Sequence, residues 1–522
     1  MTRRNTSTVL LILALSACFL LTRGFFHAPR LSELCLSDAE YESLKASRQV
    51  SNELTPNALR FDDAELFADE EGGRLFYSVP QGGASDDPKV TVSGADFACG
   101  AAGKNCIVYT NSEYREYALV YTSLPVIKID TRSEEIGAEA VAMRFTLADN
   151  RGGAAKIVTS EGSIHIRGNS TRNDPKKNFR LTLYRQGTNR ENDTALLGLR
   201  ADGDWILYAA YGDQEKVRVV FSSNLWMDSC ARNNSFGLVN GMEYRFTEVI
   251  LNGSYQGLYA LGYPIDAKQM GITADQRGEY DEFLFKKTSW GDAVKTDARS
   301  DGYELQFTVD EFVKNNGLAV LDNYYSGLLN TSEENRADLY THTDMDTAVD
   351  IFLFLEMVQG NDHIIPGTDS IKNIFVTIKI DDKWDRITLF TPWDLDAVWG
   401  NGFFEGFTEH EYTIQPTDNR YVMRLNPVYR LLAMGDEEMA DRVRGRYAEL
   451  RAGAWSDEAL SLRLDALEQD IFGSGAFARD KARWPEGSYV ETETGLSEFR
   501  TYVTERMSAM DEWVDSGFDI LP

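Results

Sequence analysis

Short runs of alternating apolar and polar residues, each ended by turn-forming residues, follow one another from about residue 124 onward. They cover Val126–Ile129 and the stretches 140–149, 162–171 and 178–185. Successive side chains of a strand point to opposite faces, so this period of two predicts strands with one buried face. The close spacing of the runs predicts a sheet of several strands.

The pattern then becomes helical. After Asp213, which can cap the start of a helix, apolar residues recur at intervals of three and four. We therefore predict an amphipathic helix packed on the sheet, with one face formed by Val217, Val220, Phe221, Asn224 and Leu225.

A hairpin is predicted over Thr247–Asp266. Asn252 and Gly253 stand at its centre, and both tolerate the positive φ that a type I′ turn requires. The first half of the chain is thus expected to form a strand-rich lobe with one helix against it.

The second half has a different pattern. Thr347–Val358 reads as an apolar helix, and a loop at 359–373 leads into a hairpin at 374–390. From Asn426 to the end, apolar and charged residues at helical spacing predict a helical subdomain. Residues 31–120 mix one short helical patch with strand-like segments and carry no catalytic signal.

Composition bounds the protein class. A chain of 522 residues with 43% hydrophobic and 11% aromatic content can bury a large core in two or three packed units. Its 53 basic and 82 acidic residues give a formal charge of −29, which repels nucleic acids and anionic membranes. A cationic partner fits this charge, and so does a simple requirement for solubility.

The N-terminus resembles an export signal. Arg3 and Arg4 precede the thirteen apolar or small residues 9–21, which is signal-peptide geometry rather than a full membrane span. The stretch ending at Cys18 resembles a lipobox, whereas the continued apolar run also allows an uncleaved anchor to about Phe26. We expect an extracytoplasmic protein attached to the membrane only by this anchor or lipid.

The remaining cysteines are even in number. In an exported protein Cys35, Cys99, Cys106 and Cys230 allow three disulfide connectivities, and the turn-rich stretch between Cys99 and Cys106 could close without strain. The alternative is four buried free thiols. Neither CxxC nor HxxxH occurs and the five histidines are scattered, so a zinc site has little support.

The segment "TLFTPWDLDAVWG", residues 388–400, places Asp394 and Asp396 after an apolar run. A buried carboxylate costs several kcal/mol to desolvate unless a metal, an arginine or water meets it. On a strand both side chains would point to the same face. Mg²⁺ would suit such a pair, because it takes oxygen ligands from one or two carboxylates and from phosphates. The competing interpretation is a pair of turn or helix-cap aspartates.

Neighbouring motifs favour the metal. Asp369 is followed at the fourth position by Asn373, then by the hairpin and the two aspartates. An aspartate that accepts a hydroxyl proton, an asparagine that holds a metal and a metal aspartate stand in this order in the catalytic half of a protein kinase.

A second loop offers phosphate contacts. Asn169 and Ser170 lie in a stretch of small and hydroxyl residues whose backbone amides could approach phosphates. Lys176 and Lys177 then enter a strand, where a lysine can pair with nucleotide phosphates. A solvated strand end is the alternative for this lysine pair.

Three blocks together carry a family resemblance. They are "IRGNST" with "PKKNFRLTL", then "LNGSYQGLYAL", then "SIKNIFVTI" with "TPWDLDAVWG". In this order, over roughly residues 124–400, they resemble the CotH family of spore-coat kinases and their secreted relatives. The resemblance implies an α+β, atypical protein-kinase-like fold of two lobes, with a strand-rich N-lobe and a helical C-lobe. It also implies transfer of phosphate from ATP to Ser or Thr of partner proteins with a divalent metal, Mg²⁺ or Mn²⁺.

The resemblance also assigns roles by position. Lys176 or Lys177 would contact phosphates, Asp369 would be the catalytic aspartate, and the metal ligands would be Asn373, Asp394 and Asp396. Because the step from Asp369 to Asn373 is one residue shorter than in ordinary kinases, Asp362 competes for the catalytic role. Which residue acts as the glutamate of the kinase helix stays open: Glu215 is placed on the right helix, whereas Arg218 could serve a different pairing. No GxGxxG precedes the lysines.

We therefore predict four parts: a signal peptide or anchor at 1–30, a β-rich region at 31–120, a kinase-like domain at 121–425 and a helical subdomain at 426–522. The expected protein is a surface-anchored monomeric Ser/Thr kinase acting on cationic, Ser- and Lys-rich proteins. The alternative is a non-catalytic scaffold or adhesion protein of the same fold. A metal hydrolase is a weaker third option, since it lacks the expected histidines.

Overall fold

The computed structural model describes residues 30–48, 50, 66–79, 90, 97–100, 104–110, 113–151, 156–272, 282–290, 302–307, 311–402 and 412–518. The predicted export signal with Cys18 lies outside these ranges. No helix within them combines the length and apolar content needed to cross a membrane.

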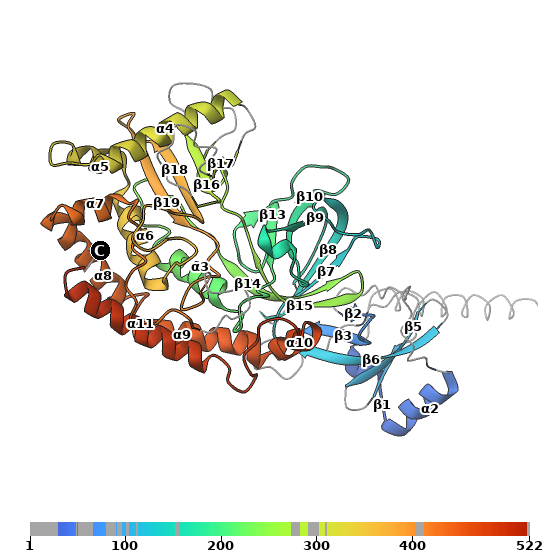
Figure 1. The fold of residues 1–522 in the computed structure, drawn as a ribbon. Helices are drawn as coiled ribbons and strands as arrows, with labels where there is room; N and C mark the ends of the chain where they lie inside the picture. The colour runs from blue at the N-terminus through green and yellow to red at the C-terminus, as the bar shows by residue number, and fades with distance from the viewer. Residues whose placement is uncertain are drawn as a thin grey trace, which may run out of the picture.

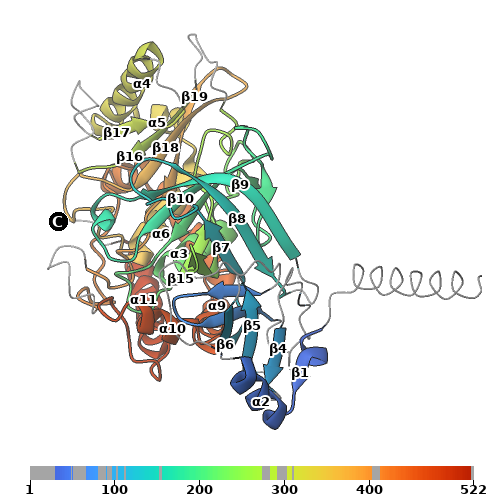
Figure 2. The same ribbon diagram turned by 90° about the vertical axis from the view of Figure 1, so that its right-hand side faces the viewer.

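A closed barrel forms the centre of the strand-rich half (Figures 1 and 2). Its strands follow one another around the barrel in the order β10, β13, β15, β14, β7, β8 and β9. The four runs predicted as strands are confirmed as β7–β10, and their inward side chains make up part of the main core. The bounds are β7 Val126–Asp130, β8 Val141–Asp149, β9 Lys156–Arg167, β10 Asn178–Tyr184, β13 Asp204–Tyr208, β14 Tyr244–Leu251 and β15 Ser254–Gly262.

The predicted hairpin joins β14 to β15. Asn252 and Gly253 have φ values of 51° and 77°, as the type I′ turn requires. Between β10 and β13 lies a small ribbon of β11 Thr194–Ala195 and β12 Ala201–Asp202, and the 3₁₀ turn η2 Ser170–Arg172 follows β9.

The predicted helix is α3, Arg218–Ser229. The capping position of this helix is Val217 and not Asp213. Asp213 still stabilises the start of the helix, because its carboxylate accepts the Arg218 amide at 2.7 Å. The helix is not amphipathic as predicted. Ser222, Ser223 and even Arg218 are buried together with its apolar residues, so α3 is covered by protein on more than one side.

A second sheet carries the predicted 374–390 hairpin. Its order is β17 Tyr303–Leu305, β16 Phe283–Lys287, β18 Ile374–Ile380 and β19 Arg386–Pro392. Figure 1 shows α4 lying beside this sheet, while α6, the predicted apolar helix, contacts β19. The helices are α4 Glu311–Leu329, α5 Arg336–His342 and α6 Met345–Val358.

Helices run along one side of the molecule to the barrel (Figure 1). They confirm the predicted helical content after Asn426, and they are α7 Pro427–Ala433, α8 Glu437–Ala452, α9 Asp457–Glu468, α10 Ala476–Arg483 and α11 Ser497–Asp515, with a π-helical turn at Gln469–Gly473. Trp455 and Phe499 from this region belong to the same apolar core as the barrel. The helices are therefore packed as part of the main body.

The described part of region 31–120 has a core of its own beside the barrel (Figures 1 and 2). Phe67 and Phe76 join it to the barrel residues Val126 and Ile250. Its sheet runs β1 Cys35–Leu36, β4 Phe97–Gly100, β5 Asn105–Thr110, β6 Glu113–Thr122, β3 Arg74–Ser78 and β2 Phe67–Asp69, with the turn η1 Leu31–Leu34 and helix α2 Asp38–Arg48. The α+β class is confirmed, while a two-lobed kinase arrangement stays a prediction.

The disulfide expectation is wrong in this structure. No disulfide joins Cys35, Cys99, Cys106 and Cys230 to one another, and the last three are buried thiols, as in the alternative interpretation. Cys230 lies in the main core, whereas Cys99 and Cys106 face each other across β4 and β5 in the N-terminal core. Cys230 therefore has no cysteine neighbour to pair with among the described residues.

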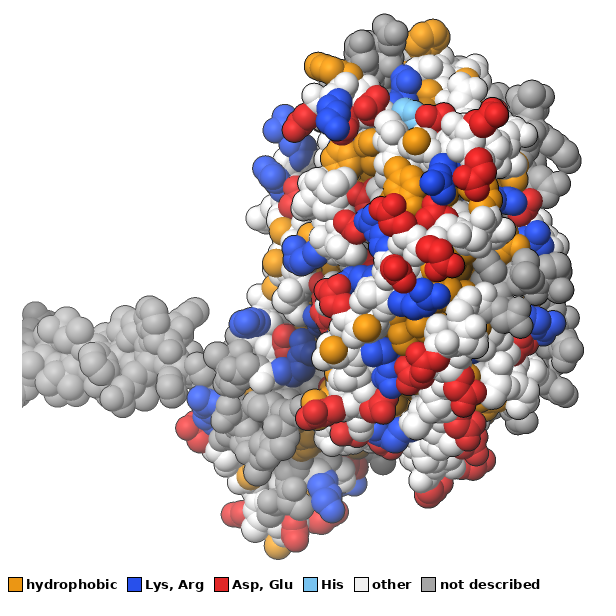
Figure 3. Space-filling model, turned by 90° about the vertical axis from the view of Figure 1, so that its left-hand side faces the viewer, with side chains coloured by type: hydrophobic (Ala, Val, Ile, Leu, Met, Phe, Trp, Pro, Cys, Tyr) orange, Lys and Arg blue, Asp and Glu red, His pale blue; other side chains and the backbone are white. Residues whose placement is uncertain are grey.

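The surface is not uniformly acidic. On the face shown in Figure 3, acidic side chains are interspersed with basic ones and with small apolar areas. Surface ion pairs such as Arg442 with Asp346 at 2.7 Å account for part of this mixing. On this face the acidic residues are thus not gathered into one continuous patch.

Candidate active site

Asp394 and Asp396 lie on a turn and not on a strand. β19 ends at Pro392, and Asp394 has the left-handed backbone value φ 60°. The strand alternation expected to align the two carboxylates is therefore wrong as the reason for their proximity. Asp394 is exposed and Asp396 is half-buried, so the turn presents both at the surface of the core.

Two helices hold this turn in place. The Trp399 amide donates to the Val358 carbonyl at 2.7 Å, and its indole N–H donates to Ser222 Oγ at 2.9 Å. Arg218 Nε donates to the Val398 carbonyl at 3.2 Å. Because α3 and the end of α6 both bind the turn, the position of Asp396 depends on the packing of these helices.

Asp362 and Asn373 form the second part of the site. Asn373 Nδ2 donates to Asp362 Oδ2 at 2.8 Å, and Lys372 Nζ lies 2.9 Å from both oxygens of the same carboxylate. Asn373 has φ 54° and its amide donates to the Lys287 carbonyl at 2.9 Å. These contacts fix the Asp362 carboxylate next to the start of β18.

The carboxylates of the two parts repel one another. Burial raises the pKa of Asp396 well above its ordinary value, and the negative charges of Asp394 and Asp362 raise it further. Burial also raises the pKa of Asp362, while Lys372 lowers it and Asp394 raises it. Three acidic groups thus lie close enough to repel one another, and an added cation would relieve the repulsion.

His363 binds the turn from inside the core. It is fully buried, and its Nε2–H donates to the Trp393 carbonyl at 2.7 Å. Burial lowers the pKa of His363 to about 4, so the ring is neutral at physiological pH. Its role in the site is to position the residue that precedes Asp394.

Two cations and an aromatic ring face the acidic groups. Arg167 Cζ and Lys286 Nζ lie 5.4 Å and 4.8 Å from the centre of the Trp393 ring. Burial lowers the pKa of Lys286, and the charge of Asp394 raises it. The sequence analysis missed Arg167 and Lys286, although Arg167 directly precedes the "GNST" stretch and Lys286 ends an apolar run.

The donor set suits a hard divalent cation only in part. Among the described residues no group of three or more His, Cys, Asp or Glu side chains has the geometry to hold a metal. Asp394 and Asp396 supply two carboxylates, and Asn373 adds an amide oxygen. This is the partial set typical of Mg²⁺, which completes its shell with water and substrate phosphates.

The predicted phosphate lysines lie elsewhere. Lys176 is fully buried, and its ammonium contacts Asp480 Oδ1 and the Ala209 carbonyl, each at 2.8 Å. Lys177 is half-buried and donates to the Arg172 carbonyl at 2.8 Å. Asn169 and Ser170 are exposed at η2. Lys176 is thus satisfied within the fold.

The two catalytic candidates separate. Asp362 joins the acidic group, whereas the Asp369 carboxylate contacts Arg430 Nη2 at 2.9 Å and is not brought to Asp394. Arg218 does pair with Glu215, but both are fully buried beneath the turn. They hold the turn from inside the core and do not reach its surface.

A comparison with known families identifies the family of the chain. Residues 164–510, more than half of the chain, match a family model described as CotH kinase protein. No curated protein matches the chain significantly.

Proposed function

The chain belongs to the CotH kinase protein family, and from this premise we propose that it is a metal-dependent protein kinase. It would transfer the γ-phosphate of ATP to Ser or Thr hydroxyls of extracytoplasmic proteins. The observation that carries the proposal is the mutual repulsion of Asp362, Asp394 and Asp396 at a turn held by two helices. A cation bound between nucleotide phosphates and these carboxylates would remove that repulsion.

The proposed metal ligands are Asp394, Asp396 and Asn373. Mg²⁺ or Mn²⁺ bound there would neutralise the charge that develops on the transferred phosphoryl group. Because the protein alone offers an incomplete set, we expect metal and nucleotide to bind together and each to bind weakly by itself.

Asp362 is the proposed proton acceptor. Its carboxylate is oriented by Lys372 and Asn373, and its raised pKa makes it a better proton acceptor than an ordinary aspartate. In the reaction the acceptor hydroxyl gives its proton to Asp362 while its oxygen attacks the γ-phosphorus and ADP leaves. Asp369 would need to leave its Arg430 contact to take this role.

Arg167 and Lys286 are the proposed phosphate contacts. They stand near Asp394 on the barrel and on β16, and the flat Trp393 ring lies between these elements. They replace Lys176 and Lys177 in the earlier assignment. A guanidinium can bind phosphate oxygens through two parallel hydrogen bonds, which an ammonium cannot.

The test is phosphate transfer from labelled ATP with Mg²⁺ or Mn²⁺ to a Lys- and Ser-rich protein. We expect Asp394→Ala and Asp362→Asn each to lower the rate at least about a hundredfold. Asp369→Asn is the matched control, because this half-buried aspartate lies in the same loop and should leave the rate nearly unchanged.

Two outcomes would contradict the proposal. Full activity of the Asp394→Ala variant would remove the metal assignment. Absence of transfer together with absence of nucleotide binding would favour the non-catalytic scaffold, for which the buried Lys176–Asp480 pair is the supporting observation. The proposed location, at the cell surface on a lipid or signal anchor, rests on residues 9–21 and is tested by fractionation of Cys18→Ala cells.

A further inference from the structure

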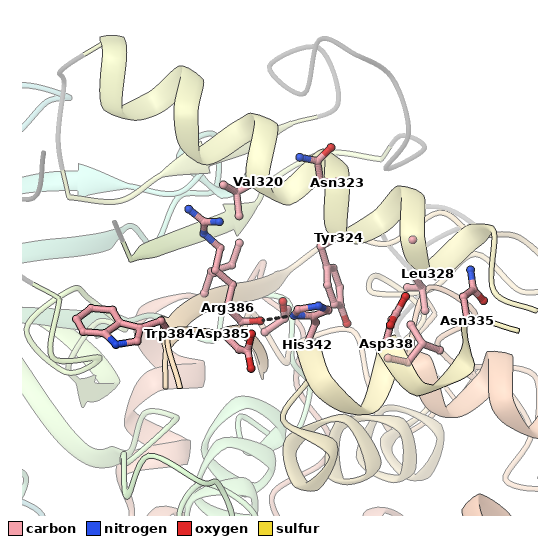
Figure 4. Close-up of a pocket in the computed structure, with 14 residues that line it drawn as sticks. Val320, Asn323, Tyr324, Leu328, Asn335, Asp338, His342, Trp384, Asp385 and Arg386 are labelled. Atoms are coloured by element: carbon pink, nitrogen blue, oxygen red, sulfur yellow. Dashed lines mark hydrogen bonds between the residues drawn. The ribbon is translucent and has the colours of Figure 1, made fainter. Parts of the chain in front are cut away.

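The β18–β19 hairpin carries the acidic turn at one end and a pocket at the other. The pocket has a volume of about 430 Å³ and lies between the hairpin tip and helices α4 and α5, with Trp384 and His342 among its lining residues (Figure 4). β19 has seven residues and spans about 20 Å at roughly 3.3 Å per residue. Contacts at this pocket are therefore too distant to fix the positions of Asp394 and Asp396.

Asn361 binds the turn directly after its second aspartate. It precedes Asp362, the proposed proton acceptor, and is 2% exposed. Its Nδ2 donates to the Ala397 carbonyl at 2.8 Å and to the Asn401 carbonyl at 2.7 Å. Because a side-chain amide has two N–H donors, Asn361 uses both of them on the turn.

The two residues that accept from Asn361 are the ones that hold Asp396. The Ala397 amide donates to Asp396 Oδ1 at 2.8 Å. Asn401 Nδ2 donates to the Asp396 carbonyl at 3.0 Å. Hydrogen bonds through Asn361 thus connect the backbone and the carboxylate of Asp396 to the residue next to Asp362.

His363 makes the corresponding contact on the other side of the turn. Its Nε2–H donates to the Trp393 carbonyl at 2.7 Å, and the Trp393 amide donates to the Asn373 carbonyl at 3.0 Å. The two sequence neighbours of Asp362 therefore bind the chain before Asp394 and after Asp396.

We propose that Asn361 is a positioning residue that fixes the location of Asp362 relative to Asp396. The proposal rests on the proposed kinase function, in which Asp362 orients the acceptor hydroxyl toward a phosphoryl group held by the metal. A displacement of about 1 Å in such an arrangement can lower the rate about a hundredfold. Because Asn361 is buried, it acts only through these two carboxylates.

Gln359 provides a matched control in the same segment. It is fully buried, and its Nε2 donates to the Gln415 carbonyl at 2.8 Å and to the Asp418 carbonyl at 3.0 Å. Like Asn361, it uses its amide on two backbone carbonyls, but these belong to a segment outside the acidic turn. Loss of the Gln359 amide should therefore lower stability without moving Asp396.

The test compares Asn361→Leu with Gln359→Met, since each change removes the amide and keeps a side chain of similar size. In transfer from ATP with Mn²⁺ to a Lys- and Ser-rich protein, Asn361→Leu should lower kcat about a hundredfold and change KM for ATP less than about threefold. Gln359→Met should leave both within about twofold, although thermal unfolding should show a loss of stability in each variant. A role in stability alone would affect the two variants alike.

Hydrogen exchange detected by mass spectrometry tests the same link without catalysis. Peptides that cover residues 393–401 should exchange at least about tenfold faster in Asn361→Leu and at an unchanged rate in Gln359→Met. Asn361→Ser, a smaller change that leaves at most one side-chain donor, repeats the comparison if the leucine variant does not fold.

The outcomes separate the positioning role from the kinase function. Unchanged exchange at 393–401 in the Asn361 variant, or equal losses of kcat in the Asn361 and Gln359 variants, would overturn the positioning role. Absence of transfer by the unmodified protein, together with the expected exchange, would refute the kinase and retain the link between Asn361 and the turn.

Discussion

At the junction of the barrel with α10, the buried ammonium of Lys176 meets the buried Asp480 carboxylate at 2.8 Å. At the turn after β19, by contrast, Asp394, Asp396 and Asp362 face one another, and Lys372 pairs with Asp362 at 2.9 Å. Asp480 also accepts the Leu258 amide at 2.8 Å and the Tyr489 hydroxyl at 2.9 Å. Charge at the junction is matched by partners, and charge at the turn is not.

This difference distinguishes two uses of costly polar groups. A buried ion pair with complete hydrogen bonding fixes how two elements pack, and it has nothing left to offer a ligand. Like charges that lie close together repel one another, and the binding of a cation would relieve this repulsion. Such groups are typical of functional sites. The junction is therefore structural, and the turn is where we propose that the chemistry takes place.

The largest expected effect is at the junction. Asp480→Asn leaves the Lys176 ammonium buried without a counter-ion, so the free energy of unfolding should fall by about 3–5 kcal/mol. Lys177→Met is the control and should change it by less than about 0.5 kcal/mol, because the ammonium of the neighbouring Lys177 donates to the Arg172 carbonyl at the surface. Chemical denaturation of the two variants measures both values. Equal losses would show that the two lysines do not differ in role.

The junction also holds one charge that is incompletely matched. Burial lowers the pKa of Lys216 to about 7, the nearby Asp480 raises it and Lys176 lowers it. The unfolded chain binds this proton more tightly, so unfolding takes up a proton between pH 7 and about 10.4. The contribution of Lys216 to the free energy of unfolding is therefore lowest below pH 7 and increases as the pH rises.

We therefore expect the free energy of unfolding to rise by about 2 kcal/mol between pH 7 and pH 9 through Lys216 alone. Lys216→Met should remove this part of the pH profile, as measured by urea denaturation at several pH values. A variant profile parallel to that of the unmodified protein would refute the assignment.

At the turn, the cations are expected to act on nucleotide and not on folding. Lys286→Met should weaken binding of Mg²⁺–ATP about tenfold, the usual value of one charged contact, with little change in unfolding. Lys268→Met is a suitable control because Lys268 already contacts Glu191 and Asp202, each at 3.0 Å. Calorimetric titration distinguishes the two, and equal losses would argue against a phosphate contact at Lys286.

The fold was predictable where the signal is local. The alternation of β7–β10 and the Asn252–Gly253 turn depend on neighbouring residues, and both are confirmed. α3 was found but misjudged as amphipathic, because Ser222 and Arg218 find partners from distant parts of the chain. Local patterns reveal that an element exists, but not what covers it.

The site was predictable only in part. Asp394, Asp396 and Asn373 lie close to one hairpin in the sequence, and the structure brings them together with Asp362. The structure pairs Lys176 with Asp480, about three hundred residues away, and no local pattern reveals such a contact. Isolated cations such as Arg167 have no pattern that links them to a distant aspartate.

The smallest expected effect comes from comparing an unmatched aspartate of the turn with a nearby aspartate that an arginine matches. Because the pKa of Asp396 is raised in the folded protein, its charge opposes folding as pH rises above about 3.9, the value of a free aspartate. Asp396→Asn should therefore stabilise the protein without nucleotide by about 1 kcal/mol at pH 7, and the gain should vanish below pH 4. Asp369→Asn removes a carboxylate that is matched by Arg430, so it should lower stability slightly. Denaturation at pH 7 measures the change in the free energy of unfolding for each variant. A gain for Asp396→Asn and a loss for Asp369→Asn would show that the carboxylates of the turn repel one another. A loss for both would show that Asp396 is a structural residue.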